Sequence, residues 1–200
     1  MNRVRKGSAP SATARAPARA AARIGTVLVV LCGLALGAGS AHAGELKPWT
    51  GGATPALALK DPSGRSYDLG AYRGKVVLVN FWATWCAPCR EEMPTMQALR
   101  QKLAARGFEV LAVNLMESEE KIAAYSDAEL IDLPFLMDRD GAAARRWKVR
   151  MLPASFIVDR HGTIRYQLLG EASWTGADVA PVIERLLDAD GKSTSASAAR

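Results

Sequence analysis

The chain has 200 residues, of which 49% are hydrophobic, and this is enough for one domain with a substantial core and appended segments. Its formal net charge is +6, but the six basic residues before Gly44 have no acidic residue among them. Residues 44–200 contain 20 basic and 20 acidic residues. The basic character therefore belongs to the N-terminal segment alone, and we exclude nucleic acid as a partner of the domain.

Residues 1–43 have the pattern of an export signal. An Ala- and Arg-rich start is followed by the apolar run Ile24–Ala38 and by Ala41-His42-Ala43, a small-residue cleavage site. As a helix the apolar run would span about 22 Å, short of the roughly 30 Å hydrocarbon core of a bilayer. We predict cleavage after Ala43 and a periplasmic location. The alternative is an uncleaved leader that anchors the chain to the outer face of the cytoplasmic membrane.

The remaining chain divides into three parts. Residues 44–54 are rich in Gly and Pro and predict an irregular lead-in. Residues 55–190 form the predicted domain, which opens with a β-hairpin because two short apolar segments flank the turn residues Asp61–Gly64. Residues 191–200 lack apolar bulk, and we expect a disordered tail there.

Hydrophobic patterning within the domain predicts alternating strands and helices. Strands are expected at 56–60, 65–69, 75–81, 108–115, 135–137, 153–158 and 163–169, and helices at 86–106, 118–126, 141–147 and 175–189. A hairpin, then β-α-β-α-β, then β-β-α is the order of a thioredoxin-like fold. The predicted class is α/β, a three-layer sandwich in which helices cover both faces of a mixed sheet.

The sequence Cys86-Ala87-Pro88-Cys89 lies where an apolar strand passes into a helix, a position typical of a redox-active dithiol. The helix N-terminus favours a thiolate at Cys86, and Cys89 lies one helical turn further on. Cys32 lies in the leader, so the mature chain would keep only these two cysteines. We predict that Cys86 is the attacking nucleophile and that Cys89 resolves the mixed disulfide.

Four segments carry a family resemblance: Val79–Arg90, Val113–Ser118, Leu152–Asp159 and Gly162–Ile164. Through them the chain resembles the TlpA/ResA family of exported, thioredoxin-fold thiol–disulfide oxidoreductases, from about residue 54 to 187. One departure is Ala154-Ser155, where the family commonly has two threonines.

The resemblance implies further site residues. Pro153 matches the family's cis-proline, and the backbone near Leu152 would pair with substrate; an ordinary trans proline at a strand edge is the alternative. Trp85 would offer an apolar docking surface beside Cys86.

The resemblance also implies which group handles protons. Thioredoxins have a buried Asp at the position of Asn80, and Asn cannot titrate. Glu117 would take this role, with a pKa raised by burial beside Cys89. The alternative is that Glu117 is a solvated carboxylate in the acidic run that ends at Glu120.

These features predict an enzyme, a periplasmic disulfide reductase that needs no cofactor beyond its dithiol. Ala87 is neutral, and a thiolate without extra stabilisation favours a reductant over a strong oxidant. The resemblance implies apocytochrome c or a copper-centre assembly protein as the disulfide-bearing substrate, and a membrane thiol donor as the electron source. The alternatives are a disulfide oxidase or isomerase, and a copper metallochaperone with His161 as third ligand.

Overall fold

The computed structural model describes residues 44–189. The predicted leader and the predicted tail at 191–200 lie outside the described residues. Within them, eight strands form one mixed sheet in the order β1-β8-β7-β4-β5-β6-β2-β3. The strands are β1 (Leu46–Pro48), β2 (Ala58–Lys60), β3 (Ser66–Asp68), β4 (Val76–Trp82), β5 (Phe108–Leu115), β6 (Phe135–Asp138), β7 (Ala154–Val158) and β8 (Ile164–Leu169). The helices are η1 (Leu69–Tyr72), α1 (Ala87–Leu103), η2 (Ala104–Arg106), α2 (Glu119–Glu129), α3 (Ala142–Arg146) and α4 (Ala180–Ala189).

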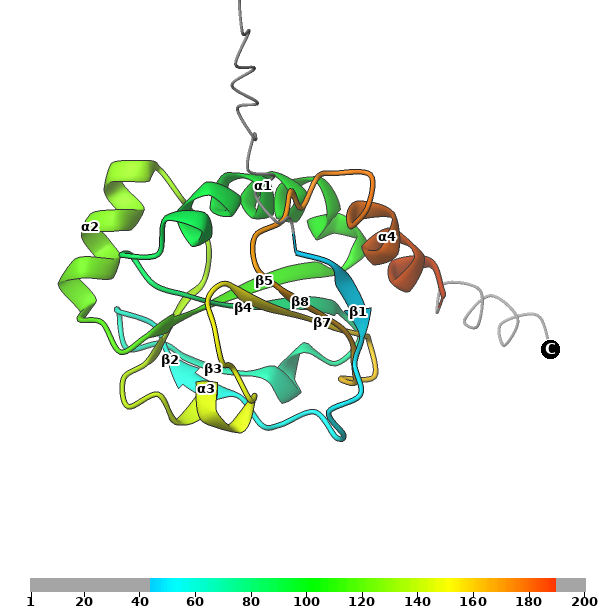
Figure 1. Ribbon diagram of the computed structural model, residues 1–200, viewed down its shortest axis with the longest axis horizontal. Helices are drawn as coiled ribbons and strands as arrows, with labels where there is room; N and C mark the ends of the chain where they lie inside the picture. The colour runs from blue at the N-terminus through cyan, green and yellow to red at the C-terminus, as the bar shows by residue number, and fades with distance from the viewer. Residues whose placement is uncertain (1–43, 190–200) are drawn as a thin grey trace, which may run out of the picture. The chain divides into compact units, whose positions relative to one another are not determined.

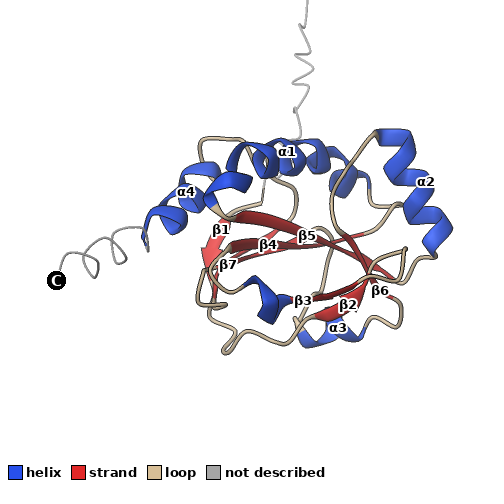
Figure 2. Cartoon of the chain, turned by 180° about the vertical axis from the view of Figure 1, so that it is seen from behind, coloured by secondary structure: helices blue, strands red, loops and turns tan. Residues whose placement is uncertain are grey.

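Helices cover both faces of the sheet, as the predicted three-layer class requires. Helices α1, α2 and α4 lie on one face and α3 lies on the other (Figures 1 and 2). All seven residues of β4 are buried, because alternate side chains enter the two cores. Leu78 packs in the core under α1, whereas Val79 packs in the core that includes Trp147.

The centre of the sheet brings the predicted site residues to one edge. β4 runs parallel to β5, and it runs antiparallel to β7 with Phe81 opposite Ala154. The loop that leads to Cys86 therefore leaves the sheet beside the residue that precedes β7, which is Pro153. β2 pairs with β3, also antiparallel, at the far end of the sheet next to β6.

The two largest errors in the predicted boundaries lie at the ends of the domain. The lead-in is not irregular throughout, because Leu46–Pro48 forms β1 and pairs antiparallel with β8. Pro48 is tolerated there since β1 is an edge strand. The last helix begins at Ala180 rather than at residue 175, because Gly176 and Asp178 are poor helix formers and Pro181 suits a first helical turn.

None of the helices described between residues 44 and 189 is long and apolar enough to cross a membrane.

Candidate active site

The two cysteines form a disulfide at the start of α1. Cys86 is the N-cap residue of this helix and Cys89 lies in its first turn. Their sulfurs are 2.08 Å apart and their Cα atoms 5.3 Å apart. Cys86 keeps 6% of its surface exposed and Cys89 none. A partner can therefore reach Cys86 before Cys89, which is the order that the predicted roles of nucleophile and resolving thiol require.

The segment before β7 flanks the dithiol with a cis peptide. The Leu152–Pro153 bond is cis, in agreement with the expectation for Pro153, and Pro153 is buried. Its carbonyl oxygen accepts a hydrogen bond from Gly170 N at 3.0 Å. Leu152 is half-buried and packs against both cores. The backbone that the resemblance assigns to substrate pairing is thus held in place from the β8 side.

Large apolar side chains are exposed around this edge of the sheet. Trp85 is 69% exposed, Met116 follows β5 and is 60% exposed, and Met151 precedes the cis peptide and is 50% exposed. Trp82, in contrast, is fully buried in the core. The expectation that Trp85 is available to a docking partner is consistent with this exposure, and two methionines extend the apolar surface.

Glu117 does not have the environment that the sequence predicted. Burial alone would raise its pKa, but hydrogen bonds from Thr84 and Asn114 outweigh burial and lower the pKa below its ordinary value. Its carboxylate accepts from Thr84 N and Thr84 Oγ1, each at 2.6 Å, and from Asn114 Nδ2 at 2.8 Å. The prediction of a raised pKa is wrong. At neutral pH Glu117 is ionised, and its hydrogen bonds to Thr84 hold the loop that contains Trp85 and leads to Cys86.

The buried carboxyl of the site is Glu92, which the sequence analysis missed. Glu92 is 2% exposed and lies on α1, three residues after Cys89. Oε1 accepts a hydrogen bond from Asn80 Nδ2 at 2.8 Å. Oε2 accepts from Ala172 N at 3.1 Å and from Trp174 Nε1 at 3.2 Å. Asn80 therefore does accompany a buried acid, but that acid is Glu92 and not Glu117.

Burial governs the acidity of Glu92. It raises the pKa of this carboxyl to about 8, against the three hydrogen bonds to Glu92, which lower it. The charge of Glu171 raises it further. Glu92 is therefore mostly neutral at pH 7 and titrates in the range where thiol chemistry takes place.

A helical spacing could have identified Glu92. Residues three apart on a helix are neighbours on its surface, so Glu92 shares a face with Cys89. The same face carries Met93 and Met96, which are buried. An acidic residue inside a stripe of buried side chains, one turn from a cysteine, is a candidate proton acceptor.

Arg90 is more constrained than a solvated helix residue. Its Nη2 pairs with Glu129 Oε1 at 2.6 Å, and its guanidinium lies 5.8 Å from the ring centre of Tyr125. Both contacts hold the start of α1 against α2. Because Glu129 neutralises it, Arg90 adds little positive charge for a thiolate at Cys86.

His161 cannot act as a third ligand beside the dithiol. It lies in the turn after β7, whose last residue, Val158, pairs with Val77 near the start of β4. Cys86 follows the other end of β4, about 20 Å away at roughly 3.3 Å per residue. The copper metallochaperone alternative therefore lacks His161 as the third ligand that it requires. Among residues 44–189, no group of three or more His, Cys, Asp and Glu side chains could hold a metal ion.

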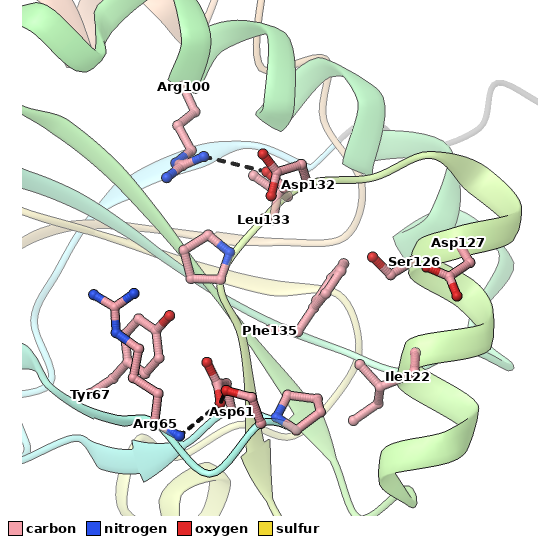
Figure 3. Close-up of a pocket in the computed structure, with 14 residues that line it drawn as sticks. Asp61, Arg65, Tyr67, Arg100, Ile122, Ser126, Asp127, Asp132, Leu133 and Phe135 are labelled. Carbon is pink, nitrogen blue, oxygen red and sulfur yellow. Dashed lines mark hydrogen bonds between the residues drawn. The ribbon is translucent and has the colours of Figure 1, made fainter.

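A pocket of about 440 Å³ lies away from the dithiol, between the β2–β3 turn, α2 and the second half of α1 (Figure 3). Its polar groups bind one another. Arg65 N donates to Asp61 Oδ1 at 2.9 Å, and Arg100 Nη1 donates to the Asp132 carbonyl oxygen at 3.3 Å. Neither cysteine lines this pocket, so we assign it no part in the redox chemistry.

Known proteins that are similar to this chain agree with the dithiol site seen in the structure. Residues 50–167 match the model of the AhpC/TSA family. The chain is 35% identical over 120 residues to the thiol-disulfide oxidoreductase ResA of Geobacillus thermodenitrificans, a match that covers 60% of this chain and 69% of that protein. For ResA of Bacillus subtilis the identity is 31% over 143 residues, covering 71% and 80%. A solved structure from Chlorobium tepidum, described as a thiol:disulfide interchange protein DsbE, is 30% identical with a TM-score of 0.65, covering 70% of this chain and 99% of that one.

The bracing role of Glu117 predicts a pH-dependent contribution to stability. Because its folded pKa is lowered, the contribution is present above the unfolded pKa of about 4.3 and is lost as pH falls through the folded pKa. We expect Glu117→Gln to lower the free energy of unfolding by about 1–2 kcal/mol at pH 7, measured by urea denaturation. The difference from the wild type should shrink below about pH 4. A difference that stays constant between pH 7 and pH 3 would contradict this. Glu45→Gln, which removes an exposed carboxylate, is the control.

Proposed function

Because this chain belongs to the AhpC/TSA family and is a thiol-disulfide oxidoreductase of the ResA type, we propose that it reduces disulfides in partner proteins outside the cytoplasm. One observation carries the mechanism. Cys86 is the reachable thiol, Cys89 is fully buried behind it, and a buried carboxyl with a raised pKa lies one helical turn beyond Cys89.

The reaction proceeds in two exchanges. The Cys86 thiolate, favoured by the N-terminus of α1, attacks a partner disulfide, forms a mixed disulfide and releases the first partner sulfur. Cys89 then gives its proton to the Glu92 carboxylate and attacks Cys86 Sγ. The bond between Cys86 and the partner breaks, and the second partner sulfur leaves with the electron pair. The chain ends in the disulfide form that the structure holds.

The electrostatics of the site favour reduction over oxidation. A strong oxidant needs a reduced form that is stabilised by an unusually stable thiolate. Here Ala87 adds no charge between the cysteines, and Glu129 neutralises Arg90. Glu92 adds no positive charge either and becomes an anion as pH rises. A disulfide oxidase or isomerase on the same fold is the alternative function, because the dithiol itself supports either direction.

The location and the partners belong to the proposal. Export to the periplasm, free or anchored at the outer face of the cytoplasmic membrane, rests on the leader pattern of residues 1–43. The partner would be a disulfide-bearing protein, apocytochrome c or a copper-centre assembly protein. A membrane thiol donor would return electrons, because the mechanism uses the dithiol alone and no cofactor.

Trapping the mixed disulfide tests the function. We expect Cys89→Ser to accumulate a covalent adduct with its partner through Cys86, because the resolving thiol is gone. Non-reducing electrophoresis and mass spectrometry of extracts from the native host would detect the adduct and identify the partner. The matched control is the double variant Cys86→Ser with Cys89→Ser. An adduct that persists in the control, or that forms more readily with Cys86→Ser than with Cys89→Ser, contradicts the assigned roles.

The reduction potential separates the two directions. We expect a value nearer to about −270 mV, typical of a reductant, than to about −120 mV, typical of a strong oxidant. Equilibration of the pure protein with glutathione and dithiothreitol buffers, followed by thiol labelling, measures this potential. A value near about −120 mV would favour the oxidase.

The role of Glu92 predicts a change in the pH–rate profile. In the wild type the rate of mixed-disulfide resolution should rise as pH passes about 8, where Glu92 loses its proton and becomes able to accept one. Glu92→Gln should lack this rise and resolve at least about tenfold more slowly at pH 9, in rapid-mixing measurements. Glu184→Gln, on α4, is the control. A Glu92→Gln profile that matches the wild type would remove Glu92 from the mechanism.

A further inference from the structure

The Asn80 side chain combines two strong hydrogen bonds with one unmade bond. Asn80 is fully buried, and its Nδ2 donates both to Glu92 Oε1 and to Ser155 Oγ, each at 2.8 Å. Its Oδ1 is buried and accepts no hydrogen bond from any side chain or backbone group of residues 44–189. All partners of the amide therefore lie on the side that now holds Nδ2, and this orientation suits only one state of the site.

The hydrogen bonds of Glu92 show which state that is. Ala172 N and Trp174 Nε1 are donors that cannot become acceptors, and both point at Oε2. A proton on the Glu92 carboxyl must therefore lie on Oε1. The partner of Oε1 is Asn80 Nδ2, which is also a donor. The observed arrangement thus fits the ionised carboxylate, and in the neutral acid two donors would face each other.

A half-turn of the Asn80 amide removes this conflict. It brings Oδ1 to the place of Nδ2, where it can accept from the protonated Oε1 of Glu92. The hydroxyl of Ser155 can rotate and change from acceptor to donor, so it can bond to the same Oδ1. The half-turn thus gives Asn80 Oδ1 two donors without any movement of the backbone, and the amide nitrogen takes the place where Oδ1 had no partner among the described residues.

We propose that Asn80 is a proton-linked positioning residue, whose amide turns over when Glu92 gains or loses its proton and so stabilises both states of the acid. This inference rests on the proposed role of Glu92 as proton acceptor. When Cys89 gives its proton to Glu92, the new O–H bond on Oε1 finds an acceptor in Asn80 Oδ1. When Glu92 releases the proton, Nδ2 returns to the carboxylate.

The side chains around Glu92 come from three elements. Cys89, which is disulfide-bonded, lies one turn before it on α1, and β4 contributes the uncharged Asn80. A cleft of about 220 Å³ beside α1 is lined by Glu92 itself, by Glu91 and Thr95 on the same helix, and by Glu171 after β8. This cleft offers a route for proton exchange with solvent that does not pass the docking edge around Trp85. The charge of Glu171 favours the protonated form of Glu92.

Rotation of the Asn80 amide also connects Glu92 with β7, the strand that follows the cis peptide. Ser155 lies on β7, two residues after Pro153, and its bond to Asn80 reverses direction in each cycle. Ser155 therefore needs a hydroxyl and not merely a small side chain. A threonine would provide the same hydroxyl, which accounts chemically for the tolerated Ala154-Ser155 departure.

Neutron diffraction on crystals of the oxidised protein tests the turn directly, because it distinguishes the amide nitrogen from the oxygen. At pH 10 we expect Nδ2 of Asn80 toward Glu92, and at pH 5.5 we expect Oδ1 there, with deuterium on Oε1. The same amide orientation at both pH values would overturn the proposal. Since the cysteines are disulfide-bonded, they do not titrate in this experiment. The orientation of the Asn80 amide can therefore be measured whether or not the protein has the proposed reductase activity.

Two variants give a second test in solution. Infrared spectroscopy of the Glu92 carboxyl in the oxidised protein, with Glu92→Gln subtracted, follows its titration. Trp174→Phe removes a donor that serves only the carboxylate, so the midpoint should rise by about one pH unit. Asn80→Leu removes a group that serves both states, so the midpoint should move by less than about half a unit. If Asn80→Leu raised the midpoint as much as Trp174→Phe, the Asn80 amide would act only as a fixed donor to the carboxylate, and the proposal would be wrong. If Asn80→Leu does not fold, Asn80→Ala serves in the same comparison, because alanine also has neither a donor nor an acceptor in its side chain.

Discussion

The buried carboxyl of Glu92 is the polar contact around which the site is built. It joins α1 to β4 through Asn80, and to the segment after β8 through Ala172 and Trp174. Removing a carboxyl from water is costly unless hydrogen bonds replace the lost solvation. The three donors supply that replacement, and they fix α1 against the strand from which it emerges. The dithiol is therefore positioned by polar contacts as well as by packing.

The fold followed from the hydrophobic pattern, because the central elements are strongly apolar. The run that became β4 is buried along its whole length, and a run of that kind predicts a central strand with cover on both faces. The AhpC/TSA match and the ResA relatives confirm the family expected from the four sequence segments. The boundaries that failed lie at the two ends of the domain. Local composition was weak there, and the pairing of β1 with β8 is a long-range contact that composition does not contain.

The site was predicted where the chemistry is covalent and missed where it is electrostatic. Cys86, Cys89 and the cis peptide at Pro153 carry patterns of spacing that the sequence displays. The pKa of a carboxyl depends instead on what surrounds it after folding. Glu117 has three strong donors and a lowered pKa, whereas Glu92 has more complete burial and a raised one. Both stand in acidic stretches of sequence, and only their different depths and donors separate a structural brace from a proton acceptor.

A proton acceptor near pH 7 must have two states of similar free energy, and a dry interior makes that difficult. Fixed donors around a carboxyl favour its anion, while burial favours its neutral form. A site built from fixed donors alone would stabilise the ionised carboxylate and destabilise the neutral acid. A side-chain amide offers a donor and an acceptor on the same pivot, so it can serve both states with little reorganisation. An Asp at position 80 could not do this beside Glu92, because two buried carboxyls in contact resist double ionisation. The replacement of Asp by Asn at this position and the burial of an acid on α1 are therefore two parts of one arrangement.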